Sequence, residues 1–207
     1  MRLVRSLGNQ VIVRGAARRT AYAARRPLRG SMASLPLYRV DDAGRAVQVG
    51  VLDPVYPAGC ALALTAPFGW PLDAEMQDGW FRGLPYPLDD MRPQGFLGRN
   101  FARTYGPILG VGQDPLRWSE DDSLHALAMM GSDCPGDLVL GDAALLRHLD
   151  AVQRGITAVT DAELGVAYPE HARAAMQEGA AGSSAGGEFP KFGAFRERGG
   201  ARYHALV

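Results

Sequence analysis

The first third of the chain alternates apolar and polar positions, which is the pattern of half-buried strands. Residues Leu35 to Val40 and Ala46 to Leu52 follow it, and the Asp-Asp-Ala-Gly sequence at 41–44 has the composition of a hairpin turn. Shorter apolar runs predict three more strands, at Val11–Val13, Thr20–Ala23 and Cys60–Leu64.

Helical patterns occupy the middle of the chain. Residues Phe96 to Tyr105 predict a helix that ends at Gly106-Pro107. Ser119, with Asp122 three residues later, resembles an N-cap arrangement for a helix that stops at Gly131. Two more helices are expected, one over 142–152 with Leu145, Leu146 and Leu149 on one face, and one over 170–178 after Pro169.

The remaining apolar runs predict strands again. They are 137–141, Phe189 to Arg196 and Ala201 to Val207, the last two joined by a turn at 197–200. Strands come first, then mostly helices, then strands, and this order favours an α+β fold over alternating βαβ units.

The net charge of zero conceals an uneven distribution. The 207 residues hold 22 basic and 22 acidic side chains, and all basic residues but Lys191 are arginine. Residues 1–30 carry eight arginines and no acid, so the rest of the chain is acidic. This excludes a uniformly basic nucleic-acid-binding protein and leaves open a basic segment on an acidic body.

Other classes are excluded by what the sequence lacks. No run of 18 apolar residues is present, so we expect no membrane contact and a cytoplasmic protein. The Arg-rich, acid-free start also fits a mitochondrial transit peptide by composition. Cys60 and Cys134 are 74 positions apart and the four histidines are scattered, so neither a disulfide framework nor a metal site is expected.

The N-terminal segment predicts a helix end closed by Gly8-Asn9 and then a hairpin with a basic tip. That layout is the last third of a winged-helix module, in which the wing contacts DNA phosphates. On this interpretation Arg14, Arg18 and Arg19 are the candidate phosphate contacts. The alternative is an ordinary solvated basic hairpin.

The segment 179–192, GAAGSSAGGEFPKF, is the one stretch with clear chemical content. Its small residues allow backbone N–H groups to approach phosphate oxygens, and two hydroxyls and a lysine add donors. A strand follows at once, as in the glycine-rich loops that cover nucleotides in protein kinases. A flexible linker has the same composition, and neither GxxxxGK[ST] nor GxGxxG is present.

Two blocks resemble the HipA family of bacterial toxin kinases. The first is DMRPQGFLGR within residues 83–99, accompanied by WSEDD at 118–122 and PGDL at 135–138, and the second is SSAGGEFPKF at 183–192. The resemblance spans nearly the whole chain and is closest to the branch with a fused N-terminal winged helix.

The resemblance implies a division of the chain. Residues 1–30 would be a remnant of the winged helix, 31–155 a β-rich N-terminal subdomain, and 156–207 a partial kinase N-lobe without the C-lobe. The loop would hold ATP, accompanied by Mg²⁺ in the full-length family, although tight binding by this chain alone is not expected. The nucleotide-binding candidates are Ser183, Ser184, Ala185, Gly186, Gly187 and Lys191.

In the family a loop serine is also autophosphorylated, which expels the loop and switches the kinase off. That role would fall here on Ser183 or Ser184. The catalytic aspartate, the asparagine and the metal-binding aspartate of kinases have no counterpart in the sequence, so no catalytic residue is assigned.

Three functions remain compatible with the sequence. The chain could be the N-terminal part of a HipA-like serine/threonine kinase, acting with a separate C-terminal kinase half or an antitoxin. It could be a non-enzymatic module that masks a kinase, or a DNA-binding regulator that makes weak, non-specific contacts through residues 1–30.

Overall fold

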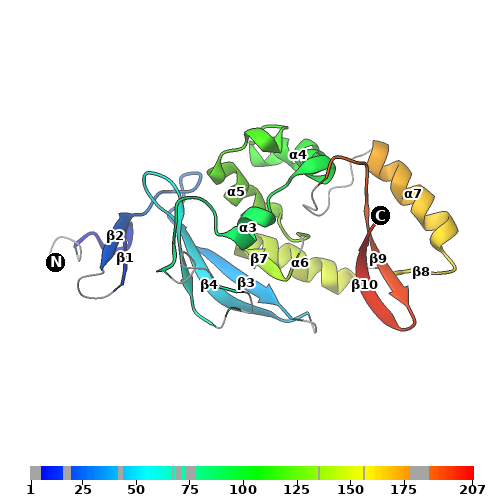
Figure 1. The fold of residues 1–207 in the computed structure, drawn as a ribbon, viewed down its shortest axis with the longest axis horizontal. Coiled ribbons are helices and arrows are strands. Elements are labelled where there is room, and N and C mark those ends of the chain that lie inside the picture. The colour runs from blue at the N-terminus through cyan, green and yellow to red at the C-terminus, as the bar shows by residue number, and fades with distance from the viewer. Residues whose placement is uncertain are drawn as a thin grey trace.

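The computed structural model describes residues 6–15, 20–41, 44–66, 68, 71–72, 78–134, 136–155, 157–177 and 187–207. Figure 1 shows an elongated molecule with a small N-terminal hairpin at one end, a central sheet covered by helices, and a C-terminal helix with its own sheet. Strands and helices are both abundant, so the expectation of a mixed α+β chain is confirmed.

The N-terminal hairpin follows the two apolar runs in the sequence. After a short 3-10 turn, η1 (Gly8–Gln10), strand β1 (Val11–Arg14) pairs antiparallel with β2 (Ala21–Ala24). Both predicted strands are thus present, whereas the predicted helix before Gly8 lies almost wholly outside the described residues.

The central sheet has five antiparallel strands in the order β6-β5-β4-β3-β7. The predicted hairpin forms its centre, and its second strand runs two residues further than expected. The strands are β3 (Leu35–Val40), β4 (Ala46–Pro54), β5 (Cys60–Leu64), β6 (Trp80–Phe81) and β7 (Leu138–Leu140).

Helices cover this sheet and close the main core. They are α3 (Tyr86–Asp90), α4 (Gly95–Leu109), the 3-10 turn η3 (Pro115–Arg117), α5 (Glu120–Met130) and α6 (Asp142–Arg154). Sheet residues Leu37, Leu52 and Leu62 share a buried cluster with side chains of α3 and α5. A second cluster joins Phe101 of α4 to Trp118 and Ala126.

Helix α4 continues past the residues that were expected to end it. Pro107 lies in its last turn, where the missing N–H removes a single helical hydrogen bond, and the ring is tolerated there. The helix ends instead at Gly110, whose φ of 64° is the left-handed conformation that glycine adopts easily.

Helix α6 confirms the predicted helix but corrects its apolar face. Ala144 is buried and Leu145 and Leu149 are half-buried, whereas Leu146 is 66% exposed. Residues 145 and 149 lie one above the other on a helix, and residue 146 is rotated about 100° from residue 145 and about 60° from residue 149.

The C-terminal part packs α7 (Leu164–Gln177) on a three-stranded sheet in the order β10-β9-β8. Strand β8 (Val159–Thr160) runs parallel to β9 (Gly193–Arg198), which forms a hairpin with β10 (Ala201–Leu206). A third cluster forms here, with Ala175 and Tyr168 of α7 against Phe192 and Ala194.

Two boundaries of this part differ from the prediction: the start of the helix was predicted too late, and the start of the strand that follows it was predicted too early. Helix α7 begins six residues before the predicted start, with Pro169 inside it rather than before it. The Thr160 backbone N–H and hydroxyl both donate to the Glu163 carboxylate, which organises the helix start upstream of the proline. Strand β9 begins at Gly193 rather than at Phe189.

Candidate functional site

The glycine-rich segment is only partly described. Of the six predicted nucleotide-binding residues, Gly187 and Lys191 belong to the described part, and Ser183, Ser184, Ala185 and Gly186 lie outside it. The site is therefore built from the C-terminal end of the segment and from what that end contacts.

Gly187 has a backbone conformation that favours glycine, and it lies beside the end of the Lys191 side chain. Its φ of 105° is disfavoured for residues with a side chain, and an added Cβ would lie 2.6 Å from the Nζ atom of Lys191. The half-buried Lys191 thus places its ammonium group directly against the backbone of the glycine-rich segment.

The N-terminus of α4 receives this backbone. Gln94, the residue before the helix, makes no side-chain capping hydrogen bond, and the Phe96 N–H donates to the Gly187 carbonyl oxygen at 3.0 Å. Because the first N–H groups of a helix lack intrahelical acceptors, the carbonyl from the distant segment acts as a substitute cap.

Gly95 makes this close approach possible. A Cβ at Gly95 would lie 2.9 Å from the Gly187 nitrogen and closer still to its carbonyl oxygen, and the φ of Gly95 is 62°. Beside this contact, Arg99 and Glu188 form an ion pair at 2.5 Å, with side chains 38% and 70% exposed. We call Gly95, Phe96 and Arg99 the loop seat.

The loop seat brings together the two sequence blocks that carried the family resemblance. Arg99 belongs to DMRPQGFLGR and Glu188 to SSAGGEFPKF, and the two are 89 positions apart. Neither Gly95 nor Arg99 is among the residues predicted to bind nucleotide. The absence of a good N-cap residue at Gln94 was the available signal that α4 is capped from elsewhere.

Arg14, a predicted DNA-phosphate contact, lies against the central part of the molecule. Its guanidinium carbon is 5.9 Å from the centre of the Trp80 ring, and its buried Nε atom has no hydrogen-bond partner among the described residues. Desolvation by burial lowers the pKa of Arg14, partly offset by Asp53. Arg18 and Arg19 lie outside the described residues, and DNA contact by the three stays a prediction.

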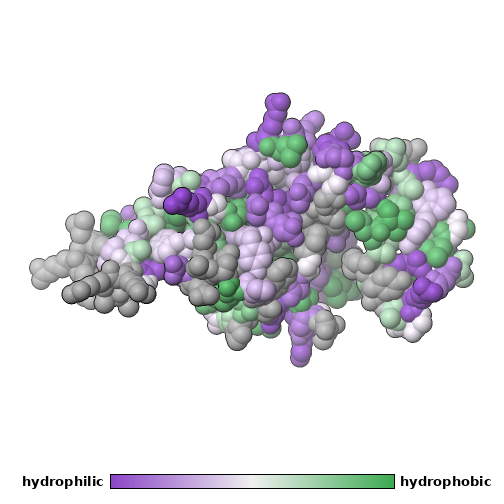
Figure 2. All heavy atoms as spheres, in the orientation of Figure 1, coloured by the Kyte–Doolittle hydropathy of each residue, from purple (hydrophilic) through white to green (hydrophobic). Residues whose placement is uncertain are grey.

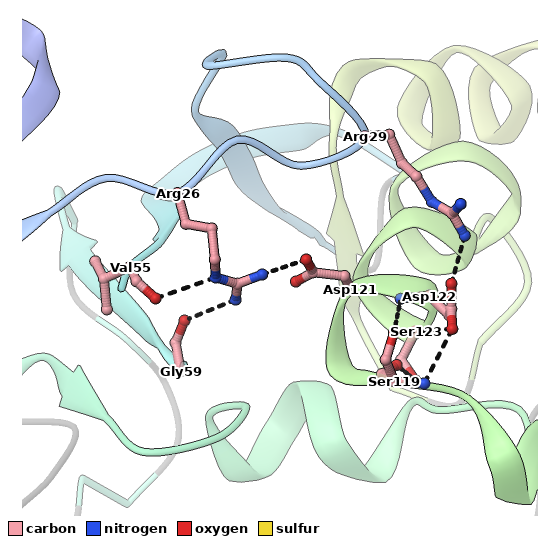
Figure 3. Close-up of polar contacts among 8 residues, drawn as sticks. All are labelled: Arg26, Arg29, Val55, Gly59, Ser119, Asp121, Asp122 and Ser123. Atoms are coloured by element: carbon pink, nitrogen blue, oxygen red, sulfur yellow. Dashed lines mark hydrogen bonds and ion pairs between the residues drawn. The ribbon is translucent and has the colours of Figure 1, made fainter. Parts of the chain in front are cut away.

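Three other N-terminal arginines pair with carboxylates of the central part. Arg25 bonds to Asp53 of β4 at 2.5 Å and to Ser34. Figure 3 shows Arg26 between Asp121 of α5 and the carbonyl oxygens of Val55 and Gly59, with Arg29 on Asp122. We call Arg25, Arg26 and Arg29 the arginine clamp, because it fastens the chain after the N-terminal hairpin onto the central sheet and α5.

Other chemistry is sparse among the described residues. They contain no group of three or more His, Cys, Asp or Glu side chains that could hold a metal ion, and no helix among them is long and apolar enough to cross a membrane. Both cysteines are free, and burial raises the pKa of the Cys60 thiol to about 12. A cavity of about 50 Å³ lies between α4 and α5, bordered by Phe101, Tyr105 and Cys134 among others.

Comparison with known proteins identifies the family. A model described as the YjjJ-like toxin, middle domain, matches residues 31–149. Toxin YjjJ of Escherichia coli (strain K12) is 36% identical over 204 residues, which cover 96% of this chain and 42% of that protein. No solved structure matches the chain.

These findings place the chain in the HipA-like class of toxins. Within that class, it belongs to the YjjJ-like toxin family. The chain spans less than half the length of the curated relative that it matches.

Proposed function

We propose that this chain supplies the nucleotide-holding part of a HipA-like serine/threonine toxin kinase. Residues 183–191 would cover the phosphates of ATP, with backbone N–H groups and Lys191 as donors. The observation that carries the proposal is the seating of the glycine-rich segment on α4, because a loop must be held in place to act on a ligand.

The described residues fit a phosphate-covering loop better than a linker. Gly95 and Gly187 have no side chains, and their backbones approach each other closely where the glycine-rich segment meets α4. The Lys191 ammonium group lies beside the Gly187 backbone. A flexible linker would not need so close a backbone contact with a distant helix. The described residues contain no group of three or more His, Cys, Asp or Glu side chains that could hold Mg²⁺.

Phosphorylation of Ser183 or Ser184 would switch this site off. A phosphate carries a charge of about −1.5 to −2, and in this loop it would repel the phosphates of ATP. Transfer of phosphate to a protein would need the kinase aspartates, which we assign to a further polypeptide segment or partner. An antitoxin is the other partner expected for a toxin family.

The test is to co-express the chain with an active, full-length HipA-like kinase and to map phosphate by mass spectrometry. We expect modification at Ser183 or Ser184, and its loss in a Ser183→Ala, Ser184→Ala double variant. Ser132→Ala, in the loop after α5, is the matched control and should leave the modification unchanged. Phosphate found only at other positions would contradict the switch.

The purified chain also tests whether the 207 residues hold nucleotide without catalysing phosphate transfer. We expect no measurable ATP hydrolysis or kinase activity from the 207 residues alone, and only weak ATP binding by calorimetry. Turnover that a Lys191→Ala substitution abolishes would show that the chain is a complete enzyme and would overturn this proposal.

A further inference from the structure

We propose that the cavity between α4 and α5 is a docking pocket for an arginine side chain of a partner protein. The proposal goes beyond the nucleotide-holding role, because none of the described residues of the glycine-rich segment lines this cavity. It rests on the size of the cavity, on its aromatic wall, and on the kind of polar groups that border it.

The volume of the cavity, about 50 Å³, suits the end of one side chain. An engineered cavity of about 150 Å³ binds benzene, and a single buried water needs about 10–15 Å³. The space therefore exceeds what one water requires and is too small to enclose a drug-sized organic ligand. A planar group carried into it on a flexible side chain fits these limits.

The wall of the cavity is apolar and aromatic. Phe101 and Tyr105 of α4 line it together with Leu127 and Met130 of α5. The Phe101 and Tyr105 rings meet edge to face with their centroids 4.9 Å apart, and Phe101 also contacts the Trp118 ring. Aromatic rings attract cations, and the planar, weakly hydrated guanidinium group of arginine stacks on them better than the ammonium group of lysine does.

The polar side chains that border the cavity can all accept hydrogen bonds. Tyr105 and Ser132 are half-buried and Asp133 is exposed. Within the described part of the chain, none of these three side chains forms a hydrogen bond or an ion pair. A guanidinium group carries five N–H donors and no acceptor, so it matches hydroxyl oxygens and a carboxylate that are open to new partners.

The charge at the cavity favours a cation. Asp133 is the one charged side chain among the described residues that line it. Arg147 of α6 approaches the end of α5, but its Nε–H donates to the Met129 carbonyl oxygen and it does not line the cavity. An exposed carboxylate beside aromatic rings is complementary to a positive charge on a planar group, and arginine is enriched among the residues that anchor protein interfaces.

The experiment measures alkylation of Cys134 by iodoacetamide in the 207-residue chain, with and without a blocked glycine-arginine-glycine tripeptide. Cys134 is half-buried and lines the cavity, so an occupied cavity should protect its thiol. Cys60 is fully buried and burial raises its thiol pKa to about 12, so its reaction reports unfolding instead. By mass spectrometry, we expect the tripeptide to slow reaction at Cys134 by about threefold or more.

The matched probe is the same tripeptide with citrulline in place of arginine, because citrulline has nearly the same shape and no charge. We expect no protection from it, and weaker protection from a lysine tripeptide. Equal protection by the arginine peptide and either of these would overturn the proposal, since the planar cation would not be the group recognised. Protection by free methylguanidinium without protection by the arginine tripeptide would assign the cavity to a small molecule and would also overturn it.

Two substitutions locate the effect. Asp133→Asn removes the charge and Tyr105→Leu removes the aromatic ring, and each should abolish most of the protection. Asp90→Asn is the matched control, because Asp90 is exposed and has no ion pair within the described residues but does not line the cavity. Protection is the ratio of the Cys134 rates without and with the tripeptide, so a direct effect of a substitution on the thiol cancels. Unchanged protection in Asp133→Asn would contradict the docking pocket.

A second measurement needs no reaction at the thiol. Titration with the arginine tripeptide should shift the backbone amide signals of Gly131 and Ser132 in nuclear magnetic resonance spectra and leave that of Glu197 in β9 in place. Absence of both the shifts and the protection would overturn the proposal. The co-expression test reads phosphate at Ser183 and Ser184, so the docking pocket and the proposed function can each fail while the other holds.

Discussion

Three of the eight arginines in residues 1–30 form ion pairs with carboxylates of the folded chain itself. The arginine clamp uses Asp53, Asp121 and Asp122 as partners, and Arg26 also donates to two backbone carbonyl oxygens. The basic segment and the acidic remainder of the sequence therefore partly neutralise each other within the fold. The first supplies the arginines of these ion pairs, and the second supplies the carboxylates.

We predict that Arg26→Met lowers the free energy of unfolding by about 2 kcal/mol, because Asp121 loses its ion-pair partner and the Val55 carbonyl oxygen loses the hydrogen bond from Arg26. Arg26 is 14% exposed in its side chain, whereas Arg45, which pairs with Asp41, is 78% exposed. Arg45→Met is therefore the control and should cost less than about 0.5 kcal/mol. Urea denaturation followed by circular dichroism measures the free energy of unfolding of both variants. Equal losses would show that the Arg26 contacts stabilise the chain no more than an exposed ion pair does.

His125 should make stability depend on pH. Burial, followed by the positive charge of Arg29, lowers its pKa below the ordinary value of 6.5, against an opposing effect of Asp122. On acidification, His125 of the unfolded chain binds a proton near pH 6.5, whereas His125 of the folded chain stays neutral to a lower pH. The free energy of unfolding therefore decreases as the pH drops below about 6.5.

The expected result is a shallower decline in stability between about pH 7 and pH 5 for His125→Gln than for the wild type. Denaturant titrations at stepped pH measure the slope. Identical slopes for the two proteins would mean that His125 titrates alike in the folded and unfolded states.

Among the elements, α5 is the one whose start the sequence specifies most completely. The Ser119 hydroxyl accepts from the Asp122 N–H, and the Asp122 carboxylate accepts from the Ser119 N–H, so the predicted N-cap is confirmed as a capping box. Asp122 also holds Arg29, which couples the cap to the arginine clamp.

Ser119→Ala should destabilise the chain by about 1 kcal/mol, because it removes the acceptor for the Asp122 N–H. Ser119→Asp restores an acceptor at the same position and should recover most of the loss. Thermal unfolding of the three proteins checks this, and a Ser119→Asp variant as unstable as Ser119→Ala would show that the cap is not the cause.

Local sequence signals predicted the boundaries of an element well where a single signal was present. They failed where two signals in the same segment disagreed. The hairpin of β3 and β4 has a single turn signal and alternating strands, and it forms as expected. At α7 a proline competed with the Thr160-x-x-Glu163 capping signature, and at α4 a Gly-Pro pair competed with Gly110. Both prolines nevertheless lie inside their helices, and Pro107 is tolerated because it falls in the last turn of α4.

At the scale of the whole molecule, the C-terminal sheet has an edge. Within the described residues, β10 pairs only with β9, and the last residues Leu206 and Val207 are 52% and 45% exposed. Figure 2 shows apolar surface at this end of the molecule. An exposed apolar edge strand is a template for pairing with another chain.

We expect the purified chain to associate as its concentration rises, and Leu206→Lys to reduce this association. Leu116→Lys is the control, since Leu116 is 81% exposed but lies in η3, away from any strand. Sedimentation velocity over a concentration series gives the comparison. Equal reduction by both substitutions would point to general hydrophobicity rather than edge pairing.

The sequence by itself determined the α+β composition, most strands, the α5 cap and the two blocks that indicate the toxin family. These depend on residues within a few positions of each other, where turn, capping and periodicity rules act. Only the tertiary structure decided that Arg25, Arg26 and Arg29 hold Asp53, Asp121 and Asp122, and that Gly187 caps α4 at Phe96. Such pairings join positions up to 95 residues apart, and chain folding alone sets which charges and backbone groups meet.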